Sequence, residues 1–374
     1  MKKIVITGAS GLLGWHAHSQ LLAVNCACRF RGEPLVYNIV PLDHAGFQSD
    51  ENLLEALSDA DAVLHFAGVN RASDEIISKE NPAIAERLVA TCNLAGSSPH
   101  IVYANSTHSR ADTVYGVSKR LAGEALASNA RLCSNIMYPH IFGESAKPYY
   151  NNVTATLIDQ ILKGTEASIN PDGSVSLLHA GEAASIAIDC ILNDHNGDLS
   201  PESKKIGIPE LYDVLKNMHN LYTNNIIPNV EDNFSLNLFN AYRFATYPGN
   251  WPYTLRQNKD DRGVLFEAVK GGGAGQTFMS TTKPGITRGD HFHLKKVERF
   301  LVVSGNATIR IRQVLNSKVW EFPVSGDKPQ AVDMPTLCTH SIENTGSTDL
   351  LTLFWTHEIF DPAAPDTYAE PVLI

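Results

Sequence analysis

The chain has 374 residues, of which 43% are hydrophobic and 19% are charged, and its formal net charge is −10. This length exceeds what one hydrophobic core usually holds, so two domains are expected, and the composition is that of a globular protein rather than a disordered one. The acidic balance argues against nucleic acids and anionic membranes as partners, because both require basic surfaces.

No stretch of the sequence has the features of a membrane span or a leader. No apolar run approaches the ~20 residues of a membrane-spanning helix, and the first residues begin directly with a predicted strand, without a charged and apolar leader. The six cysteines include no CxxC pair. We therefore expect a cytoplasmic protein whose thiols are free and mostly buried.

The first part of the chain alternates short apolar strands with helical stretches. Helices are predicted at residues 12–24 and 114–130, and strands at residues 3–6, 36–42, 62–66, 101–104 and 135–138. Such alternation predicts an α/β fold with a doubly wound parallel sheet of the Rossmann type. Residues 26–34 are interpreted as an insertion after the first helix.

The pattern changes near residue 245. A segment rich in proline, glycine and charge is followed by short apolar–polar alternations such as FLVVSGNATIRIRQV and LLTLFWTHE. These predict antiparallel strands of an all-β barrel. We expect residues 1–245 to form the first domain and residues 246–374 the second, with a mobile glycine-rich turn at residues 271–275.

A glycine-rich turn follows the first predicted strand. In TGASGLLG, Gly8 allows a tight turn, Gly11 lets backbone amides approach a pyrophosphate, and Gly14 lets the helix pack closely on the sheet. The N-terminus of the following helix adds its partial positive charge. The turn therefore predicts a dinucleotide cofactor.

The residue that selects the cofactor is expected at the end of the second strand. Asp43 is the candidate acid for the ribose hydroxyls of NAD(H). It comes later than the usual ~20 residues after the glycines, which the insertion explains. Arg29 and Arg31 within the insertion favour NADP(H), although a solvated loop charge explains them equally well. We expect NADP(H), with NAD(H) as the alternative.

A serine, a tyrosine and a lysine further along the chain are suited to acid–base chemistry. Ser106 ends a predicted strand, where it can hydrogen-bond a reacting oxygen. Tyr115 and Lys119 are four residues apart on a helix and so share a face. A neighbouring ammonium group is expected to lower the pKa of the phenol and make it a usable proton donor. We predict that these residues are catalytic, and the family resemblance described below implies that Lys119 also holds the cofactor.

The second part of the chain carries a pattern of metal ligands. His291 and His293 are one residue apart on a predicted strand, Glu298 follows after a turn, and His340 lies in DMPTLCTHSIEN. This spacing resembles the cupin motifs, except that Leu337 replaces a glycine. Three imidazoles and a carboxylate suit a divalent metal, most often zinc, with Fe(II), Mn(II) or Ni(II) as alternatives.

The glycine turn, the strand-end serine and the YxxxK pair together resemble the extended short-chain dehydrogenase/reductase family. HFAG at residues 65–68 also matches that family's pattern. The 4,6-dehydratases of the family carry an Asp–Glu pair after the triad serine or threonine, whereas Thr107 and His108 stand here. The resemblance therefore implies a keto reductase or a 4-epimerase rather than a dehydratase.

The combination of both parts resembles the CapF type of bacterial capsule and O-antigen enzymes, in which a reductase domain with a nucleotide-sugar subdomain precedes a metal-binding cupin. The segments that carry the resemblance are AGVNR, YGVSK, KPYYNNV, DDRG, KPGITRGDHFH, FLVVSG and FDPAAPDTY. It implies that a UDP-linked 2-acetamido-2,6-dideoxy-4-ketohexose is epimerised at C3 by the cupin and reduced at C4 by the reductase. It also implies substrate contacts at Arg71 and Asn151. Lys283 and His357 are weak candidates for the base of the cupin, and His357 is expected to pack instead.

Three other functions stay open at this point. The cupin can serve only to dimerise or regulate a reductase, the chain can be a 4-epimerase that retains its NAD, or it can be a nucleotide sensor without turnover. Because cupin barrels commonly pair through edge strands, a homodimer is expected.

Overall fold

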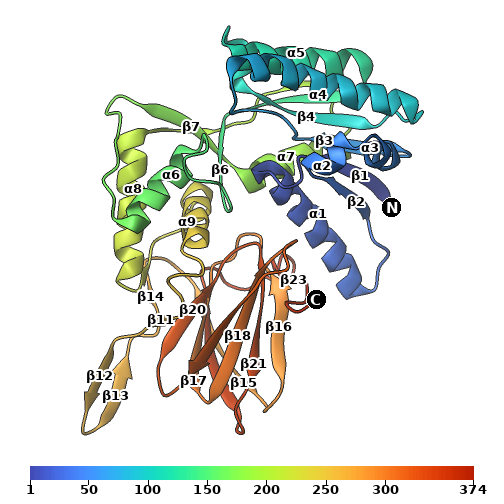
Figure 1. The fold of residues 1–374 in the computed structure, drawn as a ribbon. Coiled ribbons are helices and arrows are strands. Elements are labelled where there is room, and N and C mark those ends of the chain that lie inside the picture. The colour runs from blue at the N-terminus through green and yellow to red at the C-terminus, as the bar shows by residue number, and fades with distance from the viewer. The chain divides into compact units, whose positions relative to one another are not determined.

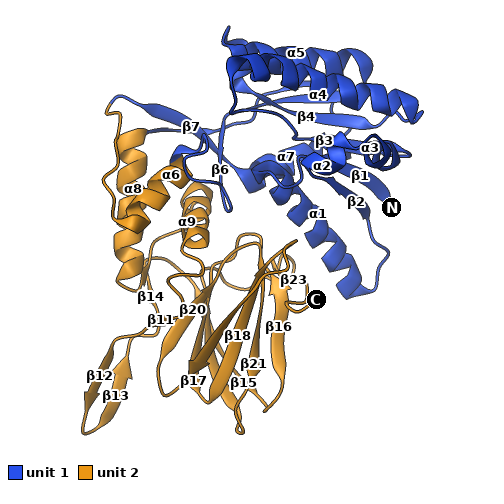
Figure 2. Ribbon diagram, viewed as in Figure 1, with its two compact units in different colours: residues 1–153, 172–207 blue, residues 154–171, 208–374 orange.

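The computed structural model describes residues 1–374. The chain divides into two compact units, residues 1–153 with 172–207, and residues 154–171 with 208–374 (Figure 2). Residues 208–245 thus group with the second unit, while the domain boundary near residue 245 stays a prediction. None of the helices combines the length and the apolar character that crossing a membrane requires.

A parallel sheet forms the centre of the first unit, and its strands follow the order β2-β1-β3-β4-β5-β8. They are β1 (Lys2–Thr7), β2 (Tyr37–Leu42), β3 (Ala62–His65), β4 (His100–Ser106), β5 (Leu132–Tyr138) and β8 (Gly197–Leu199). The order reverses between β1 and β3, and ligands of such sheets bind beyond the carboxyl ends of the strands at this point. The predicted doubly wound sheet is confirmed.

Helices cover both faces of this sheet (Figure 1). Ile4 and Ile6 of β1 pack with α1 (Leu12–Arg31) and α7 (Ala180–Leu192), whereas Val5 between them packs with the other helices. The helices on that second face are α3 (Asp50–Leu57), α4 (Asp74–Leu94) and α5 (Val114–Asn129). The remaining elements of the unit are α2 (His44–Gln48), the short 3₁₀ helix η1 (Thr107–Arg110) and a small sheet of β6 (His140–Phe142), β7 (Ser174–His179) and β9 (Lys204–Gly207).

The expected insertion at residues 26–34 is instead largely helix. Helix α1 continues to Arg31 and ends at Gly32, whose φ of 70° is the left-handed conformation that closes many helices. An α-helix rises about 1.5 Å per residue, so Arg29 lies roughly 26 Å along the helix from its first residue, Leu12. Arg29 and Arg31 therefore lie far from the glycine turn, and the interpretation of them as NADP-selecting loop residues is wrong.

The second unit is built on two antiparallel five-stranded sheets, which confirms the predicted all-β region. The orders are β11-β20-β17-β22-β15 and β19-β18-β21-β16-β23. The strands are β11 (Tyr253–Thr254), β15 (Gln276–Thr282), β16 (Thr287–Phe292), β17 (Glu298–Ser304), β18 (Asn306–Gln313), β19 (Val319–Ser325), β20 (Gln330–Met334), β21 (Cys338–Asn344), β22 (Leu350–Thr356) and β23 (Tyr368–Ala369). Their inward side chains, among them Ile309, Val332 and Ile342, form one buried core.

The second unit also contains other elements. They are the helices α6 (Val153–Lys163), α8 (Ile208–Thr223) and α9 (Asn233–Ala245), the hairpin of β12 (Gln257–Asp260) and β13 (Gly263–Phe266), and the pair of β10 (Ile226–Ile227) and β14 (Lys270–Gly271). The glycine run at residues 271–275 is held within this unit. The Gly272 amide donates to the Ile227 carbonyl, and a side chain at Gly275 would lie 2.5 Å from the Thr356 carbonyl. The run is therefore packed rather than a free turn. All six cysteines are free and buried, as predicted.

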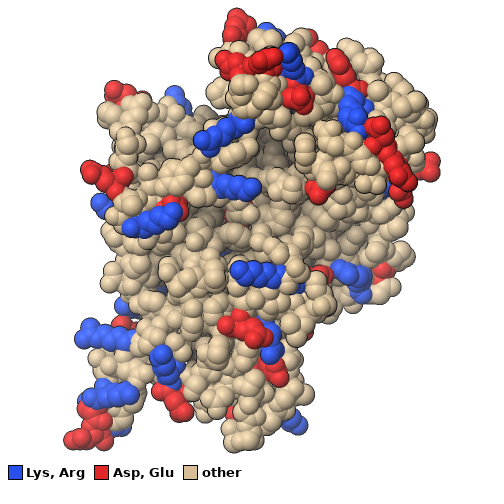
Figure 3. Space-filling view, in the orientation of Figure 1, with Lys and Arg blue, Asp and Glu red and all other residues tan.

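One buried ion pair joins β17 to β20. Figure 3 shows charged side chains of both signs interspersed on the face it presents, whereas Arg299 and Asp333 are only 1% and 0% exposed. Two nitrogens of Arg299 donate to the two carboxylate oxygens at 2.5 and 3.0 Å, and Tyr222 of α8 also donates to this carboxylate at 2.5 Å. Asn225 accepts a further bond from Arg299 at 2.5 Å. Both charged groups are thus hydrogen-bonded inside the protein.

We expect Asp333→Asn to lower the free energy of unfolding by about 3 to 5 kcal/mol, because it leaves the Arg299 charge buried without compensation. Urea unfolding followed by tryptophan fluorescence measures this change. The matched control is Asp260→Asn, which removes an exposed carboxylate from its pair with Arg262 and should leave the midpoint unchanged. Equal midpoints for the two variants would show that the buried pair does not stabilise the unit.

Candidate functional site

The glycine turn between β1 and α1 leaves no room for side chains. Gly8 has a φ of 68°, and a Cβ there would lie 2.8 Å from the Ala67 amide nitrogen. A Cβ at Gly14 would lie 2.2 Å from the Gly8 carbonyl oxygen. Gly11 is the N-cap of α1, and it provides no side chain that could bind the first backbone amides of the helix. This arrangement suits the backbone binding of a phosphate group.

Asp43 lies where the cofactor-selecting acid was expected, directly after β2. The Ala9 amide of the glycine turn donates to the Leu42 carbonyl at 3.2 Å, which brings this strand end beside the turn. The Asp43 side chain is exposed, and one of its oxygens accepts the Gly46 amide at 2.8 Å as the N-cap of α2. Its role toward a ribose stays a prediction.

The structure brings the three predicted catalytic residues to one place, at the end of β4 and the start of α5. Ser106 is the last residue of β4 and shares a side-chain hydrogen bond with Tyr115. Lys119, one turn further along α5, is 6% exposed, and its ammonium group donates to the Ala104 carbonyl at 2.7 Å. The same group lies 4.2 Å from the centre of the Tyr103 ring.

Burial changes the pKa values of both α5 residues. It lowers the pKa of Lys119 to about 7. It raises the pKa of Tyr115, and the hydrogen bond with Ser106 only partly offsets this rise. The expectation that Lys119 lowers the pKa of Tyr115 is therefore wrong for this structure, in which the ammonium group contacts Ala104 and Tyr103 instead. A phenol with a raised pKa stays protonated at neutral pH and can donate its proton.

Two residues that the sequence analysis did not single out position this triad. A Cβ at Gly116 would lie 2.3 Å from the His108 carbonyl, so a glycine is needed where α5 approaches η1. Asn81 of α4 is 3% exposed, exchanges two hydrogen bonds with the Val69 backbone at 2.8 and 2.9 Å and donates to the Ser118 hydroxyl at 3.0 Å. It thereby fixes the loop after β3 against α5. The need for the glycine beside Tyr115 could have been recognised from the sequence, whereas no sequence pattern points to Asn81.

The predicted substrate contacts Arg71 and Asn151 link two loops of the first unit. The Asn151 amide donates to the Asn70 carbonyl at 3.0 Å, and the Arg71 guanidinium donates to the Tyr149 carbonyl. Tyr149 and Asn151 have positive φ values of 60° and 48°, a conformation uncommon for residues other than glycine and enriched at functional sites. Contact of these side chains with a substrate stays a prediction.

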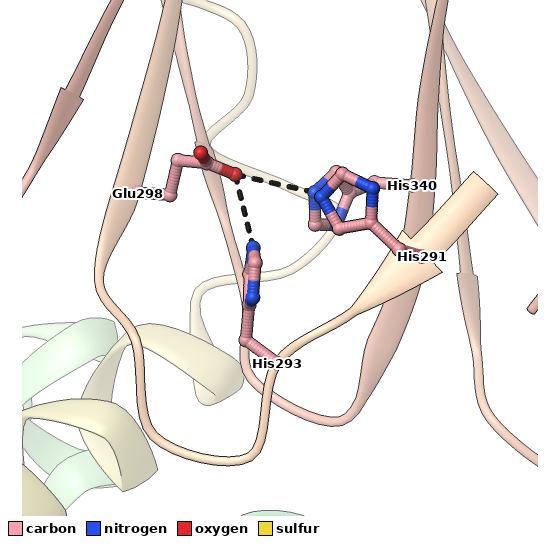
Figure 4. A group of neighbouring side chains, drawn as sticks. All are labelled: His291, His293, Glu298 and His340. Atoms are coloured by element: carbon pink, nitrogen blue, oxygen red, sulfur yellow. Dashed lines mark hydrogen bonds and ion pairs between the residues drawn. The ribbon is translucent and has the colours of Figure 1, made fainter. Parts of the chain in front are cut away.

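The four predicted metal ligands converge in the second unit (Figure 4). His291 lies in β16 directly opposite His340 of β21, His293 follows the end of β16, and Glu298 begins β17. One carboxylate oxygen of Glu298 lies 3.1 Å from Nε2 of His293 and 3.2 Å from Nε2 of His340. One ligand atom of each of the four residues lies within 4.8 Å of the others.

These residues fit a metal ion. Zinc binds imidazole nitrogen and carboxylate oxygen at about 2.0 to 2.2 Å in a mostly tetrahedral arrangement, so two ligand atoms on one ion are about 3.4 Å apart. The four ligand atoms lie within 4.8 Å of one another, so the side chains would have to move closer together by up to about 1.4 Å to bind the ion. The donor set of three imidazoles and one carboxylate is one that zinc and neighbouring divalent metals prefer.

The charges of the cluster also favour a cation. Burial, followed by the neighbouring His340 and His293, lowers the pKa of His291 to about 3. Burial by itself would raise the pKa of Glu298, but hydrogen bonds and charges from His293 and His340 hold it well below its ordinary value. For His293, burial by itself would lower the pKa, but the hydrogen bond with Glu298 and the negative charges of Glu298 and Asp366 raise it. The cluster thus holds an ionised carboxylate inside the protein, which a cation can neutralise.

Leu337, which replaces the usual glycine, takes up the glycine conformation, with a φ of 58°. Its amide donates to the His293 carbonyl at 2.8 Å, so the departure from the motif keeps a contact to a ligand residue. His357 accepts the Val297 amide through Nδ1 at 3.1 Å, in agreement with the expectation that it packs. Lys283 is exposed in the turn after β15.

Comparison with known proteins decides the family. The sequence pattern of the NAD dependent epimerase/dehydratase family matches residues 4–207, which is more than half of the chain. The chain belongs to this family. The pattern described as the polysaccharide biosynthesis C-terminal domain matches residues 258–368 of this family member.

Relatives over the full length place this epimerase/dehydratase family member among the CapF-type enzymes. It is 27% identical over 376 residues to the UDP-2-acetamido-2,6-beta-L-arabino-hexul-4-ose reductase of Pseudomonas aeruginosa, with 98% of each chain covered. It is 31% identical to the capsular polysaccharide assembling protein CapF of Staphylococcus aureus, whose crystal structure matches with a TM-score of 0.61 and covers 99% of this chain and 100% of that one. The predicted CapF type is confirmed.

A further similarity concerns the fold alone. The UDP-N-acetylglucosamine 4-epimerase of Bacillus cereus is 18% identical and matches with a TM-score of 0.52, over 67% of this chain and 99% of that one.

Lys119→Met tests the burial of the ammonium group through the pH dependence of stability. In the unfolded chain the lysine keeps its ordinary pKa of 10.5, whereas in the folded protein burial lowers it to about 7. Between these pH values the unfolded state binds more protons, so wild-type stability gains up to about 1.4 kcal/mol per pH unit from this group as the pH rises. The variant should therefore be more stable than the wild type below pH 7, and its advantage should shrink toward pH 10.

Urea unfolding of both proteins from pH 6 to 10 measures this difference. Lys79→Met is the matched control, because Lys79 is exposed on α4 beside Glu75 and should show no such pH-dependent gap. A constant gap between Lys119→Met and the wild type across this range would mean that Lys119 is not desolvated in the folded protein.

Proposed function

We propose that this chain reduces the C4 ketone of a UDP-linked 2-acetamido-2,6-dideoxy-4-ketohexose with NAD(P)H, after its cupin has epimerised C3. The product is UDP-2-acetamido-2,6-dideoxy-L-talose or a close relative, for capsule or O-antigen synthesis. One observation carries the proposal. The chain aligns over its whole length with a UDP-keto-sugar reductase and keeps Ser106, Tyr115 and Lys119 together in its first unit.

In the reductase site, each side chain has a separate task. The Tyr115 phenol, protonated because burial raises its pKa, donates the proton that the C4 oxygen needs. Ser106, already hydrogen-bonded to Tyr115, orients the same oxygen. Lys119 holds the ribose of the cofactor from the buried side of α5. A bound NAD(P)H, with NADP(H) as the expected form, supplies the hydride.

In the cupin, the buried ligand set prepares the other half of the reaction. His291, His293, Glu298 and His340 would hold a divalent cation, most often zinc. Such a cation supplies a Lewis acid to the C4 ketone, which makes the hydrogen on C3 acidic. Because the same ketone serves C3 epimerisation and C4 reduction, both activities belong on one chain.

We also propose that the protein is cytoplasmic and forms a homodimer. Six free, buried thiols support a reducing cytoplasm. Strand β15 lies at the edge of its sheet and leaves Phe278 and Met279 40% and 55% exposed, which supports pairing in a homodimer. Sedimentation at a monomeric mass would overturn the dimer.

Tyr115→Phe should lower the rate of ketone reduction by about 10²- to 10⁴-fold, because it removes the proton donor and leaves the site otherwise intact. NADPH oxidation with the UDP-4-keto sugar measures the rate, and fluorescence titration with NADPH serves as the control for cofactor binding. Full activity of the variant would show that Tyr115 is not the proton donor. Absence of turnover in the wild type would favour a nucleotide sensor, and turnover without net NADPH oxidation would favour a 4-epimerase.

Running the reaction in D₂O should place deuterium at C3 of the product, because epimerisation exchanges the C3 hydrogen with solvent. His291→Ala should abolish this deuterium, and fluorescence titration of the variant with NADPH shows whether its reductase unit is folded. Tyr115→Phe provides the converse control and should still exchange C3 in the substrate. Reduction without deuterium at C3 in the wild type would leave a reductase with a non-catalytic cupin. Mass spectrometry and proton NMR of the sugar give the readout.

A further inference from the structure

The segment of residues 361–372, which follows the last long strand β22, contacts two of the strands that carry ligands, β16 and β21. Its strand β23 pairs with β16, so that Ala369 lies opposite His291. The amides of Glu370 and Val372 donate to the backbone and side chain of Asp290 at 2.8 and 3.0 Å, and Asp290 directly precedes His291. The Thr339 hydroxyl, next to His340, donates to the Glu370 carbonyl.

Asp366 within this segment holds the loop between two ligands. One of its carboxylate oxygens accepts the Leu294 amide at 2.9 Å, and the other accepts the amides of Lys295 and Lys296 at 2.9 and 2.8 Å. These three amides belong to the short loop that joins His293 to Glu298. Bonds from amides to an ionised carboxylate are roughly twice as strong as neutral ones. One side chain thus fixes most of the loop backbone.

The backbone of Asp366 also orients a ligand directly. Its carbonyl accepts a hydrogen bond from Nδ1 of His293 at 2.6 Å. A proton fixed on Nδ1 leaves Nε2 free to bind a metal, and Nε2 is the atom that lies 3.1 Å from Glu298. Asp366 has a φ of 41°, an uncommon conformation that the surrounding contacts must maintain. Carbonyl and carboxylate of one residue therefore act on the same site.

We propose that Asp366 is a positioning residue of the metal centre and that residues 365–372 form a clamp that holds the ligands in their binding geometry. The proposal rests on the metal site proposed above. Asp366 contacts no metal and acts through His293 and through the backbone before Glu298. By fixing these ligands in advance, the clamp reduces the entropy that metal binding would otherwise cost.

Two variants test the clamp in the full chain. Asp366→Asn keeps the size of the side chain but loses its charge, and Asp366→Gly suits the positive φ and keeps the carbonyl that binds His293. Loss of such outer contacts typically weakens metal binding 10- to 100-fold, and we expect this loss of Zn²⁺ affinity in both variants. Competition with a chromophoric chelator measures it. Asp361→Ala is the matched control, because Asp361 is exposed in the same segment and accepts a bond from Ala363.

A second readout separates positioning from general stability. The absorption bands of bound Co²⁺ should shift in Asp366→Asn and stay unchanged in Asp361→Ala, since these bands report ligand geometry. Wild-type Zn²⁺ affinity in both Asp366 variants, even with a lower melting temperature of the metal-free protein, would overturn the clamp and leave the metal site standing. Failure of the wild type itself to bind Zn²⁺ or Co²⁺ would overturn the metal site and the clamp together.

Discussion

The second unit depends on the register of β17, in which one residue belongs to the cluster of possible metal ligands and the next belongs to a buried ion pair. Glu298 and Arg299 are adjacent and therefore point to opposite faces of the strand. Glu298 contacts His293 and His340, while Arg299 pairs with Asp333 directly across on β20. A shift of one residue would exchange the two charges and leave both buried without partners. The ion pair on one face thus secures the ligand geometry on the other.

The first unit uses a different constraint, the close approach of backbone segments at the carboxyl edge of a parallel sheet. Because β1, β2 and β4 run in the same direction, the residues that end or follow them, Gly8, Asp43 and Ser106, come to one edge. Helix α5 brings Tyr115 and Lys119 to this edge from the side. Burial then sets their protonation, so the fold supplies both the positions and the chemical state of the polar groups.

Local patterns in the sequence were sufficient for most of the fold and for the grouping of three histidines and one glutamate in the second unit, because strand alternation and residue spacing are short-range signals. The length of α1 was missed because Asn25 and the cysteines after it are weak helix formers, whereas Gly32 was the true stop signal. The raised pKa of Tyr115 follows from burial, which no spacing reveals. Asp366 could not be found either, since its contacts reach about 70 residues back along the chain without any periodic pattern.

The clamp follows the ligands in the chain, so the parts of the proposed metal site are synthesised in a fixed order. Residues 365–372 follow all four ligands, so translation delivers His291, His293, Glu298 and His340 before the segment that holds them. Under the proposed metal site and clamp, a chain at that stage would have its ligand loops still unfixed and would compete poorly for a scarce ion. Capture of an ion would thereby depend on completion of the barrel, and metal content would report whether that part of the chain has finished folding.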